Sequence, residues 1–493
     1  MNTLSMRPRA VELDDVQGLL RFGYKRHTEA CFLLLKVEDA DAARAFLSQV
    51  SVADAQFSDS PPVTVLQVAL SSAGMTALGV PGQVVAGFAE EFVAGMATDE
   101  DRSRRLGDQG NSHPSHWEWG SGVGVPDVLL MLYAMPGHLD VWRAELEAQL
   151  DGGFSLLAVL DSTDSGGREP FGFRDGLSQP ELDWERRRPV EDRDRLHYDN
   201  LSCLGEFLLG YPNEYGLYTD RPLLEPDRDP NGLLLRAEDW PERADLGRNG
   251  SYLVLRQLHQ DIGGFWGWLL GRADGDRDLA LRWAESMVGR SVDGKPLVHA
   301  EACGNDFTYD EDPQGQVCPI GAHIRRANPR NGDYPPGTRG LLTRLRRFLG
   351  FDAQARPLDL IASTRFHRLL RRGRSYGEPQ SLDGMLAGEA PQTPAGLHFV
   401  CLAANIGRQF EFVQNAWING TRFAGLPGEA DPLLGDRQPG SDGTPSDCFS
   451  LPRPDGPAER LCALPRFVEV KGGAYFFLPG IRALRYLAGS STR

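Results

Sequence analysis

One acidic residue, Asp175, lies between two glycines in the segment EPFGFRDGLSQP, residues 169–180. Gly172 and Gly176 permit backbone angles that are closed to other residues, so a ligand or cofactor could approach the carboxylate closely. This is the geometry of a functional site. Arg-Asp-Gly is also a common surface turn, however, and the segment by itself favours that simpler interpretation.

A histidine stands in a second segment, CPIGAHIRRANPR, residues 318–330. Small residues, Gly321 and Ala322, precede His323 and leave the clearance that a large planar group would need. A single histidine is more often a satisfied polar residue than a metal ligand, so this segment alone does not decide its role. Arg325, two residues later, is either a surface charge or a partner for a carboxylate of a bound group.

A third segment, HRLLRRGRSYGEP, spans residues 367–379 and carries adjacent arginines. Two leucines lead into Arg371 and Arg372, which favours one arginine pointing inward and the other toward solvent. A cluster of arginines is usually a solvated face. A functional role would require an anionic partner or an oxyanion that develops during a reaction.

The elements that must position these segments follow from hydrophobic periodicity. The pattern before Asp175 is strand, helix, strand and again strand, helix, strand, which is typical of a ferredoxin-like unit. The expected strands are residues 31–37, 63–70, 127–134 and 154–160. The expected helices contain residues 43–50, behind a cap at Asp39 or Asp41, and residues 139–150.

A similar pattern restarts after a charged, loop-rich stretch. Strands are expected at 251–258, 397–402 and 475–478, a helix at 279–287, and a helix face with Phe410, Val413 and Trp417. The sequence therefore predicts an α+β protein of two halves, each an antiparallel sheet with packed helices. The expected units are residues 20–180, an inserted connecting segment 181–249, and residues 250–493.

Composition limits the possible partners. The chain has 493 residues and a formal net charge of −16, which argues against nucleic acid because phosphate binding needs a basic face. No stretch of 18 apolar residues occurs, and the N-terminus MNTLSMRPRAVELDD lacks an apolar core. We expect a cytoplasmic protein without a membrane partner, and its size makes a homo-oligomer plausible.

The cysteines point to the same compartment. They are Cys31, Cys203, Cys303, Cys318, Cys401, Cys448 and Cys462. Their number is odd and they form no CxxC or CxC pair, which favours a reducing compartment and argues against a disulfide framework or a zinc cluster. Most are expected to be small hydrophobic residues of the core.

The three segments, in this order, resemble those of the dye-decolorizing peroxidases, haem enzymes with two ferredoxin-like halves. GFRDG matches the family's GxxDG motif, AHIRRANPR its proximal-histidine segment, and LLRRGRSYG its distal-arginine segment. GEFLLGYPNEYG, GSYLVLRQL and GLHFVCLAANIGRQFEFVQNAW extend the resemblance over most of the chain. An apparent insertion at 331–364 resembles that of the longer bacterial members and is expected on the surface.

The resemblance implies haem b in the C-terminal half, with His323 as the iron ligand. Asp175 would stand on the opposite face of the haem with Arg371 beside it, and Arg372 is the alternative because the arginine is doubled. Further contacts with the cofactor are implied for Gly172, Phe173, Gly176 and Arg325.

Two positions around this site stay open. His323 needs an acceptor for its second ring nitrogen, and Asn405 and Glu411 are the candidates. Trp417 or Tyr376 would carry electrons to the surface if bulky reductants cannot enter the pocket, although aromatic residues at helical spacing are generally core.

The implied activity is reduction of hydrogen peroxide with one-electron oxidation of dyes or phenolic compounds. A haem-handling protein that stores haem or releases its iron would use the same pocket, and a binding protein without cofactor is a third possibility. Asp175 and the distal arginine favour the peroxidase, since a carrier would need neither. Because an aspartate ordinarily titrates near pH 4, we expect an acidic optimum for dye oxidation.

Overall fold

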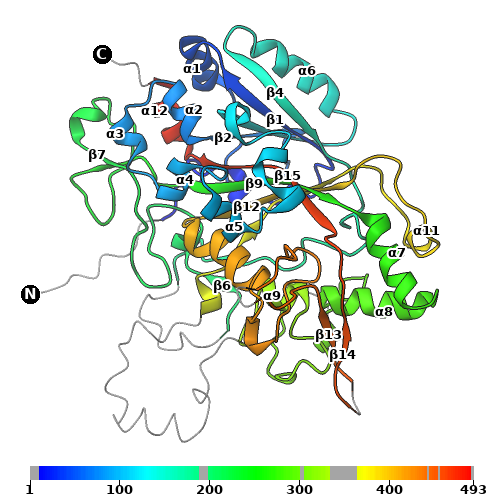
Figure 1. The fold of residues 1–493 in the computed structure, drawn as a ribbon. Helices are drawn as coiled ribbons and strands as arrows, with labels where there is room; N and C mark the ends of the chain where they lie inside the picture. The colour runs from blue at the N-terminus through cyan, green and yellow to red at the C-terminus, as the bar shows by residue number, and fades with distance from the viewer. Residues whose placement is uncertain are drawn as a thin grey trace, which may run out of the picture.

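A computed structural model of the protein describes residues 10–187, 198–299, 305–332, 363–440, 443–453 and 456–489. The central feature is a nine-stranded sheet in which every strand pair is antiparallel. Its order is β10-β12-β9-β15-β2-β3-β1-β4, with β11 also paired to β12. Helices pack on this sheet, so the expected α+β fold is confirmed (Figure 1).

The N-terminal half of the sheet has the strand order β4-β1-β3-β2. Its elements are β1 (Glu29–Val37), α1 (Ala40–Gln49), β2 (Thr64–Leu70), β3 (Val128–Ala134), α6 (Leu139–Gln149) and β4 (Phe154–Asp161). The side chain of Asp39 accepts a hydrogen bond from the Ala42 N–H at 2.9 Å and so caps α1, as its position before the helix predicts. Four short α-helices lie between β2 and β3: α2 (Ser72–Ala77), α3 (Gly82–Val85), α4 (Glu90–Ala94) and α5 (Glu100–Leu106).

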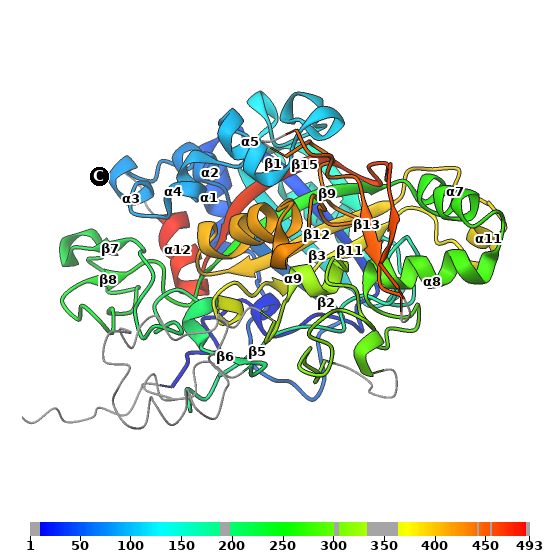
Figure 2. The same ribbon diagram turned by 60° about the horizontal axis from the view of Figure 1, so that its bottom comes forward.

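The C-terminal half repeats this order as β15-β9-β12-β10. Its elements are β9 (Ser251–Gln260), α7 (Ile262–Arg272), α8 (Arg277–Val288), α9 (His323–Ala327), β10 (Leu370–Arg371), β11 (Arg374–Tyr376), α11 (Leu382–Leu386), β12 (Gly396–Ala403), β15 (Val468–Leu478) and α12 (Ile481–Gly489). Two π-helical segments, η10 (Gly407–Glu411) and η11 (Val413–Ile418), follow β12 and lie beside α9 in both views (Figure 2).

The two half-sheets are joined edge to edge, where Phe477 of β15 pairs with Leu70 of β2. Alternate residues of β1 enter two different hydrophobic clusters, with Leu33 on one side and Phe32 and Leu34 on the other. Both faces of the sheet are therefore covered, which explains why its strands appear in the sequence as continuous apolar runs.

The described residues between the halves form only short strand pairings, β5 (Glu181–Leu182) with β6 (Leu201–Ser202) and β7 (Leu223–Leu224) with β8 (Ala244–Asp245). The division into units 20–180, 181–249 and 250–493 stays a prediction. Most of the expected 331–364 insertion lies outside the described residues. Within the described ranges, no helix has the length and hydropathy needed to cross a bilayer.

The cysteines differ from the expectation at one pair. Cys448 and Cys462 form a disulfide, although no sequence pattern links them. Cys31, Cys203, Cys318 and Cys401 are buried, as small hydrophobic residues of the core would be. One bridge within the described part of the chain is not a disulfide framework, but it weighs against the strongly reducing compartment that the cysteine pattern favours.

Candidate active site

A cavity of about 280 Å³ lies against one face of the C-terminal half-sheet. Cross-strand neighbours on β9, β12 and β15 form this wall: Leu397 and Val470 both pair with Leu258, and Phe399 pairs with Arg256. The facing wall comes from α9 and from the π-helical segments. It contains His323, Ile324, Ala327, Phe410, Val413 and Trp417.

His323 is the first residue of α9, and one of its ring nitrogens is already engaged. Its Nδ1 lies 2.9 Å from Oδ2 of Asp431, a carboxylate with no exposed surface. Burial of the imidazole opposes its charged form, but Asp431 outweighs burial and raises the pKa of His323 above its ordinary value. Since Nδ1 serves Asp431, Nε2 is the ring nitrogen left for a metal.

Asp431 corrects the sequence interpretation, because neither expected acceptor reaches His323. Asn405 Oδ1 accepts instead from the Arg408 N–H at 2.7 Å, and Glu411 accepts from the Tyr475 hydroxyl at 2.9 Å. Asp431 lies 108 residues after His323. The only local signal was an aspartate before a proline, which is an ordinary turn pattern.

Asp175 and Arg371 form the other charged group of the cavity. Arg371 Nη1 donates to Asp175 Oδ1 at 3.0 Å, and the side chains are 33% and 40% exposed, so both are open to the cavity. The Arg371 backbone N–H donates to Gln179 at 2.9 Å, which ties β10 to the chain just after Asp175. The structure thus brings together two segments separated by 196 residues.

Arg372 points elsewhere. Its Nε donates to the Leu19 carbonyl at 2.7 Å, and its Nη2 to that of Leu20 at 3.2 Å. Successive residues of an extended chain face opposite sides, so only one of two adjacent arginines can face the cavity. Of the two, Arg371 is the one that contacts Asp175.

The environment of Asp175 favours its ionised form. Burial by itself would raise the pKa of the carboxyl. The Arg371 guanidinium, the Gly176 N–H and the charge of His323 outweigh that effect and lower the pKa of Asp175 below its ordinary value. Asp175 is therefore a carboxylate at neutral pH and well into the acidic range.

The turn that carries Asp175 is held by Glu169, a residue that the sequence motif does not distinguish as functional. Its carboxylate accepts from the N–H groups of Phe171 and Phe173 at 3.0 and 2.8 Å, and from Gln260 at 2.7 Å. Burial raises the pKa of Glu169 to about 7 despite these hydrogen bonds. The signal available in the sequence was an acidic residue at the start of a glycine-rich turn.

The two glycines of this turn differ in their surroundings. Gly172 has φ +102°, and a Cβ there would lie 2.9 Å from Cε of Met385, so it serves the turn and is not among the residues that line the cavity. Gly176 has φ +71°, and a Cβ there would meet nothing within 4 Å. Gly176 and Phe173 do line the cavity, and Gly176 leaves open space next to Asp175.

Arg325 lies outside the cavity, contrary to the expected cofactor contact. Its guanidinium donates to Asp312 at 3.1 Å and to the Cys318 carbonyl at 2.8 Å, and it stacks on the Tyr309 ring at 4.4 Å. Two residues along a helix turn the side chain by about 200°, away from the direction of His323. The arginines that do line the cavity are Arg174, Arg256, Arg290, Arg368, Arg371 and Arg466.

The two aromatic candidates are placed differently. Trp417 lines the cavity, is 8% exposed, and packs edge-on against His367 and Phe412 with centroid distances of 5.3 and 5.4 Å. Tyr376 is not among the lining residues, and its hydroxyl donates to the Leu258 carbonyl at 3.1 Å. Its electron-transfer role, like that of Trp417, stays a prediction.

The doubled ferredoxin-like sheet defines the class of the protein, which is an α+β protein with a cavity on its C-terminal half. No family model matches the chain. It is 29% identical to the multifunctional dye peroxidase DyP2 of Amycolatopsis sp., over 76% of this chain and 73% of that protein. It is 26% identical to the dye-decolorizing peroxidase msp1 of Mycetinis scorodonius, over 96% and 87%.

A solved structure has the same fold. It is that of a fungal DyP-type peroxidase from Auricularia auricula-judae, with a TM-score of 0.73 and 24% identity, covering 98% of this chain and 100% of that one. The resemblance expected from the sequence is therefore confirmed: the chain is similar to the dye-decolorizing peroxidases over most of its length.

The residues present fit the haem of such enzymes. The cavity offers a histidine with one free ring nitrogen on one wall and apolar side chains such as Phe173, Leu397 and Phe399 around it. Open space beside Gly176 leaves room next to Asp175 for a flat group. Arginines at the cavity wall could pair with the carboxylates that a haem carries.

Proposed function

We propose that this protein is a peroxidase that uses haem b to reduce hydrogen peroxide and oxidises dyes or phenolic compounds in one-electron steps. The observation that carries the proposal is the Asp175–Arg371 pair in the same cavity as His323, a histidine oriented by a buried carboxylate. A haem-storage role would use His323 but has no need for an ionised carboxylate paired with a guanidinium.

His323 would hold the iron through Nε2, with Asp431 keeping its ring orientation and raising its basicity. Phe173 and Gly176 would contact the ring system, and arginines of the cavity wall would pair with its carboxylates. Arg325 is not proposed for this role because its guanidinium is bound to Asp312. When bound, haem supplies the electrons that cleave the O–O bond and regains them singly from reducing substrates.

Asp175 is proposed as the group that moves the proton. An ionised carboxylate can take the proton from one oxygen of hydrogen peroxide and return it to the other, which then leaves as water. Arg371, 3.0 Å from Asp175, would stabilise the charge that separates during this transfer. The same guanidinium keeps Asp175 ionised before peroxide arrives.

The proposal is tested by the absorption spectrum of the purified protein, before and after mixing with hydrogen peroxide. A Soret band is expected, because a bound haem is required, and a rapid spectral change with peroxide should follow. Absence of the Soret band would contradict the proposal and favour a binding protein without haem. A stable band that changes slowly with peroxide would favour haem storage.

The pH dependence of the peroxide reaction follows from the pKa of Asp175. Because this pKa lies below its ordinary value, the rate should stay level from neutral pH down to about pH 4 and fall only below it, as the carboxylate becomes protonated. Stopped-flow rates at constant ionic strength would measure this. The charged neighbours of Asp175 are Arg371, His323 and Glu169. A fall in the rate centred near pH 7 would indicate that Glu169, and not Asp175, controls the reaction.

Two features stay predictions from the sequence alone. One is the cytoplasmic location, and the Cys448–Cys462 bridge weighs against it. The other is a homo-oligomer. The proposed small-molecule partners are hydrogen peroxide and its reducing substrates, with no nucleic acid expected from the acidic charge of the chain.

A further inference from the structure

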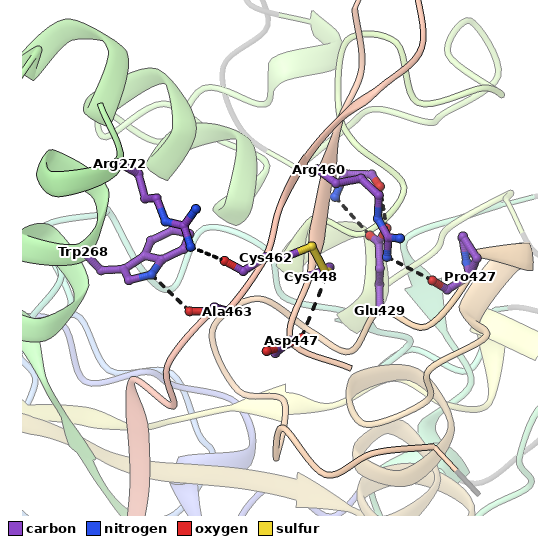
Figure 3. Close-up of a disulfide and its surroundings, with 10 residues drawn as sticks. Trp268, Arg272, Pro427, Glu429, Asp447, Cys448, Arg460, Cys462 and Ala463 are labelled. Atoms are coloured by element: carbon purple, nitrogen blue, oxygen red, sulfur yellow. Dashed lines mark hydrogen bonds and ion pairs between the residues drawn. A yellow bond between two sulfur atoms is a disulfide. The ribbon is translucent and has the colours of Figure 1, made fainter. Parts of the chain in front are cut away.

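A short disulfide-linked hairpin lies beside the chain segment that carries Asp431. Its strands, β13 (Phe449–Leu451) and β14 (Glu459–Leu461), are antiparallel with Phe449 opposite Leu461. Cys448 therefore stands opposite Cys462, and the bridge joins the two strands at their base (Figure 3). Among the described strands these two pair only with each other, and an isolated two-stranded hairpin is marginally stable without further support.

The first strand holds the chain just before Asp431. Glu429, which is 1% exposed, accepts from the Ser450 N–H at 3.1 Å and from the Ser450 hydroxyl. The Ala430 N–H donates to the Ser446 carbonyl at 3.2 Å, two residues before Cys448. Movement of β13 would therefore be transmitted directly to the residues that precede Asp431.

The chain leaving the second strand holds Asp431 from the other side. Nε of Arg437 donates to the Pro465 carbonyl at 3.2 Å. Its Nη1 donates to the Asp431 carbonyl at 2.7 Å, and its Nη2 to the Pro432 carbonyl at 2.6 Å. One guanidinium thus connects the exit of β14 to the backbone of Asp431.

The exit of β14 is in turn fixed to α7. Arg272 donates to the Cys462 carbonyl at 2.6 Å, and Trp268 to the Ala463 carbonyl at 3.2 Å (Figure 3). The disulfide therefore links a strand anchored on α7 to a strand anchored on Glu429.

We propose that the Cys448–Cys462 hairpin is a positioning element for Asp431, so that the oxidation state of the two sulfurs sets the strength of the Asp431–His323 hydrogen bond. Two of the contacts that hold the Asp431 segment, those of Glu429 and Arg437, lead to this hairpin, and the bridge is the covalent cross-link at its base. A further contact, from the Asp431 N–H to the Ile418 carbonyl at 2.8 Å, does not involve the hairpin. The consequence for iron rests on the proposed function. A weaker bond from Asp431 makes His323 a poorer electron donor, which raises the reduction potential of a bound haem.

The switching step is thiol–disulfide exchange with a dithiol. One thiolate attacks the bridge to form a mixed disulfide, and the second thiol then displaces the remaining cysteine. Two electrons and two protons pass to the protein, giving free thiols at Cys448 and Cys462 while the dithiol closes to a cyclic disulfide. Cys448 is 7% exposed and Cys462 is half-buried, so a small dithiol is the suitable reagent.

The experiment compares the oxidised holoprotein with the same protein after dithiothreitol, with thiol formation verified by alkylation and mass spectrometry. The Leu433 and Leu434 N–H groups donate to Asp431 Oδ1 at 2.9 and 2.8 Å, so their hydrogen exchange reports directly on this carboxylate. Reduction should speed that exchange by about tenfold or more and shift the haem midpoint potential upward.

The double variant Cys448→Ser/Cys462→Ser should behave like the reduced protein and should not respond to dithiothreitol. As a matched control, Asp431→Asn should shift the potential whether or not the bridge is intact. Unchanged exchange and potential after verified reduction would overturn the inference. If the protein binds no haem, the proposed function fails, but the exchange of Leu433 and Leu434 still tests the role of the hairpin.

Discussion

Replacement of Asp175 by asparagine should slow the reaction with hydrogen peroxide by about 10²–10⁴-fold, the range that a positioned proton-transfer group supplies. Asparagine keeps the size of the side chain and can still accept from Arg371, but it cannot take a proton at neutral pH. The haem spectrum should stay essentially unchanged, because Asp175 does not ligate the iron in this proposal. Stopped-flow absorbance after mixing with peroxide measures the rate.

Asp161→Asn is a suitable control for this experiment. Asp161 is 70% exposed and pairs with Arg143 on the surface, so its loss should leave the peroxide rate unchanged. An unchanged rate of reaction with hydrogen peroxide in Asp175→Asn would show that Asp175 does not move the proton. Arg371 or Glu169 would then be the candidate for that role. An altered Soret band before peroxide is added would instead show that the substitution disturbs the pocket.

Replacement of His323 by alanine should abolish stable haem binding, or leave a haem without its histidine ligand. Loss of a partner that only hydrogen-bonds to a metal-bound histidine typically costs about 10–100-fold in affinity, and loss of the ligand itself should cost more. Titration of the apoprotein with haem, followed by the Soret absorbance, measures the affinity. Addition of imidazole should partly restore the spectrum, because the position of the lost ring is then available to it.

Two further variants separate ligation from structure. Asp431→Asn keeps the ligand and should give an intermediate affinity, because His323 loses its charged acceptor. His113→Ala changes a histidine that lies on the surface beside Glu100 and is not among the lining residues of the cavity, and it should bind haem normally. Haem bound by His323→Ala as tightly as by the unaltered protein would contradict the assignment of His323.

The local patterns of the sequence were enough to locate the long strands of the sheet, but not the short strands β10 and β11. Continuous apolar runs identify β1, β3 and β9 because both faces of those strands are buried. Phe410, Val413 and Trp417 were expected on one helix face, and the chain there is helical, but as the two π-helical segments η10 and η11. A helical face is visible in the sequence, whereas the register of its backbone hydrogen bonds depends on what packs against it.

Only part of the candidate site could be predicted from local sequence patterns. Asp175, His323 and Arg371 stand in distinctive segments, and the structure places all three on one cavity. Arg325 looked equally suitable beside His323, yet it faces Asp312. Nothing in the sequence marks Asp431 as the partner of His323, and nothing in the spacing of Cys448 and Cys462 predicts their bridge.

The sequence by itself therefore determined most of the long strands, the capped start of α1 and the identities of the charged residues, since these depend on neighbours within one or two turns of chain; the short strands β10 and β11 were not predicted. Only the tertiary structure decided which of these residues meet. The two half-sheets join at Phe477 and Leu70, and the contacts of Asp431 with His323 and of Arg371 with Asp175 span 108 and 196 residues. Contacts over such separations are set by how the sheet and helices pack, and a local sequence pattern does not determine that packing.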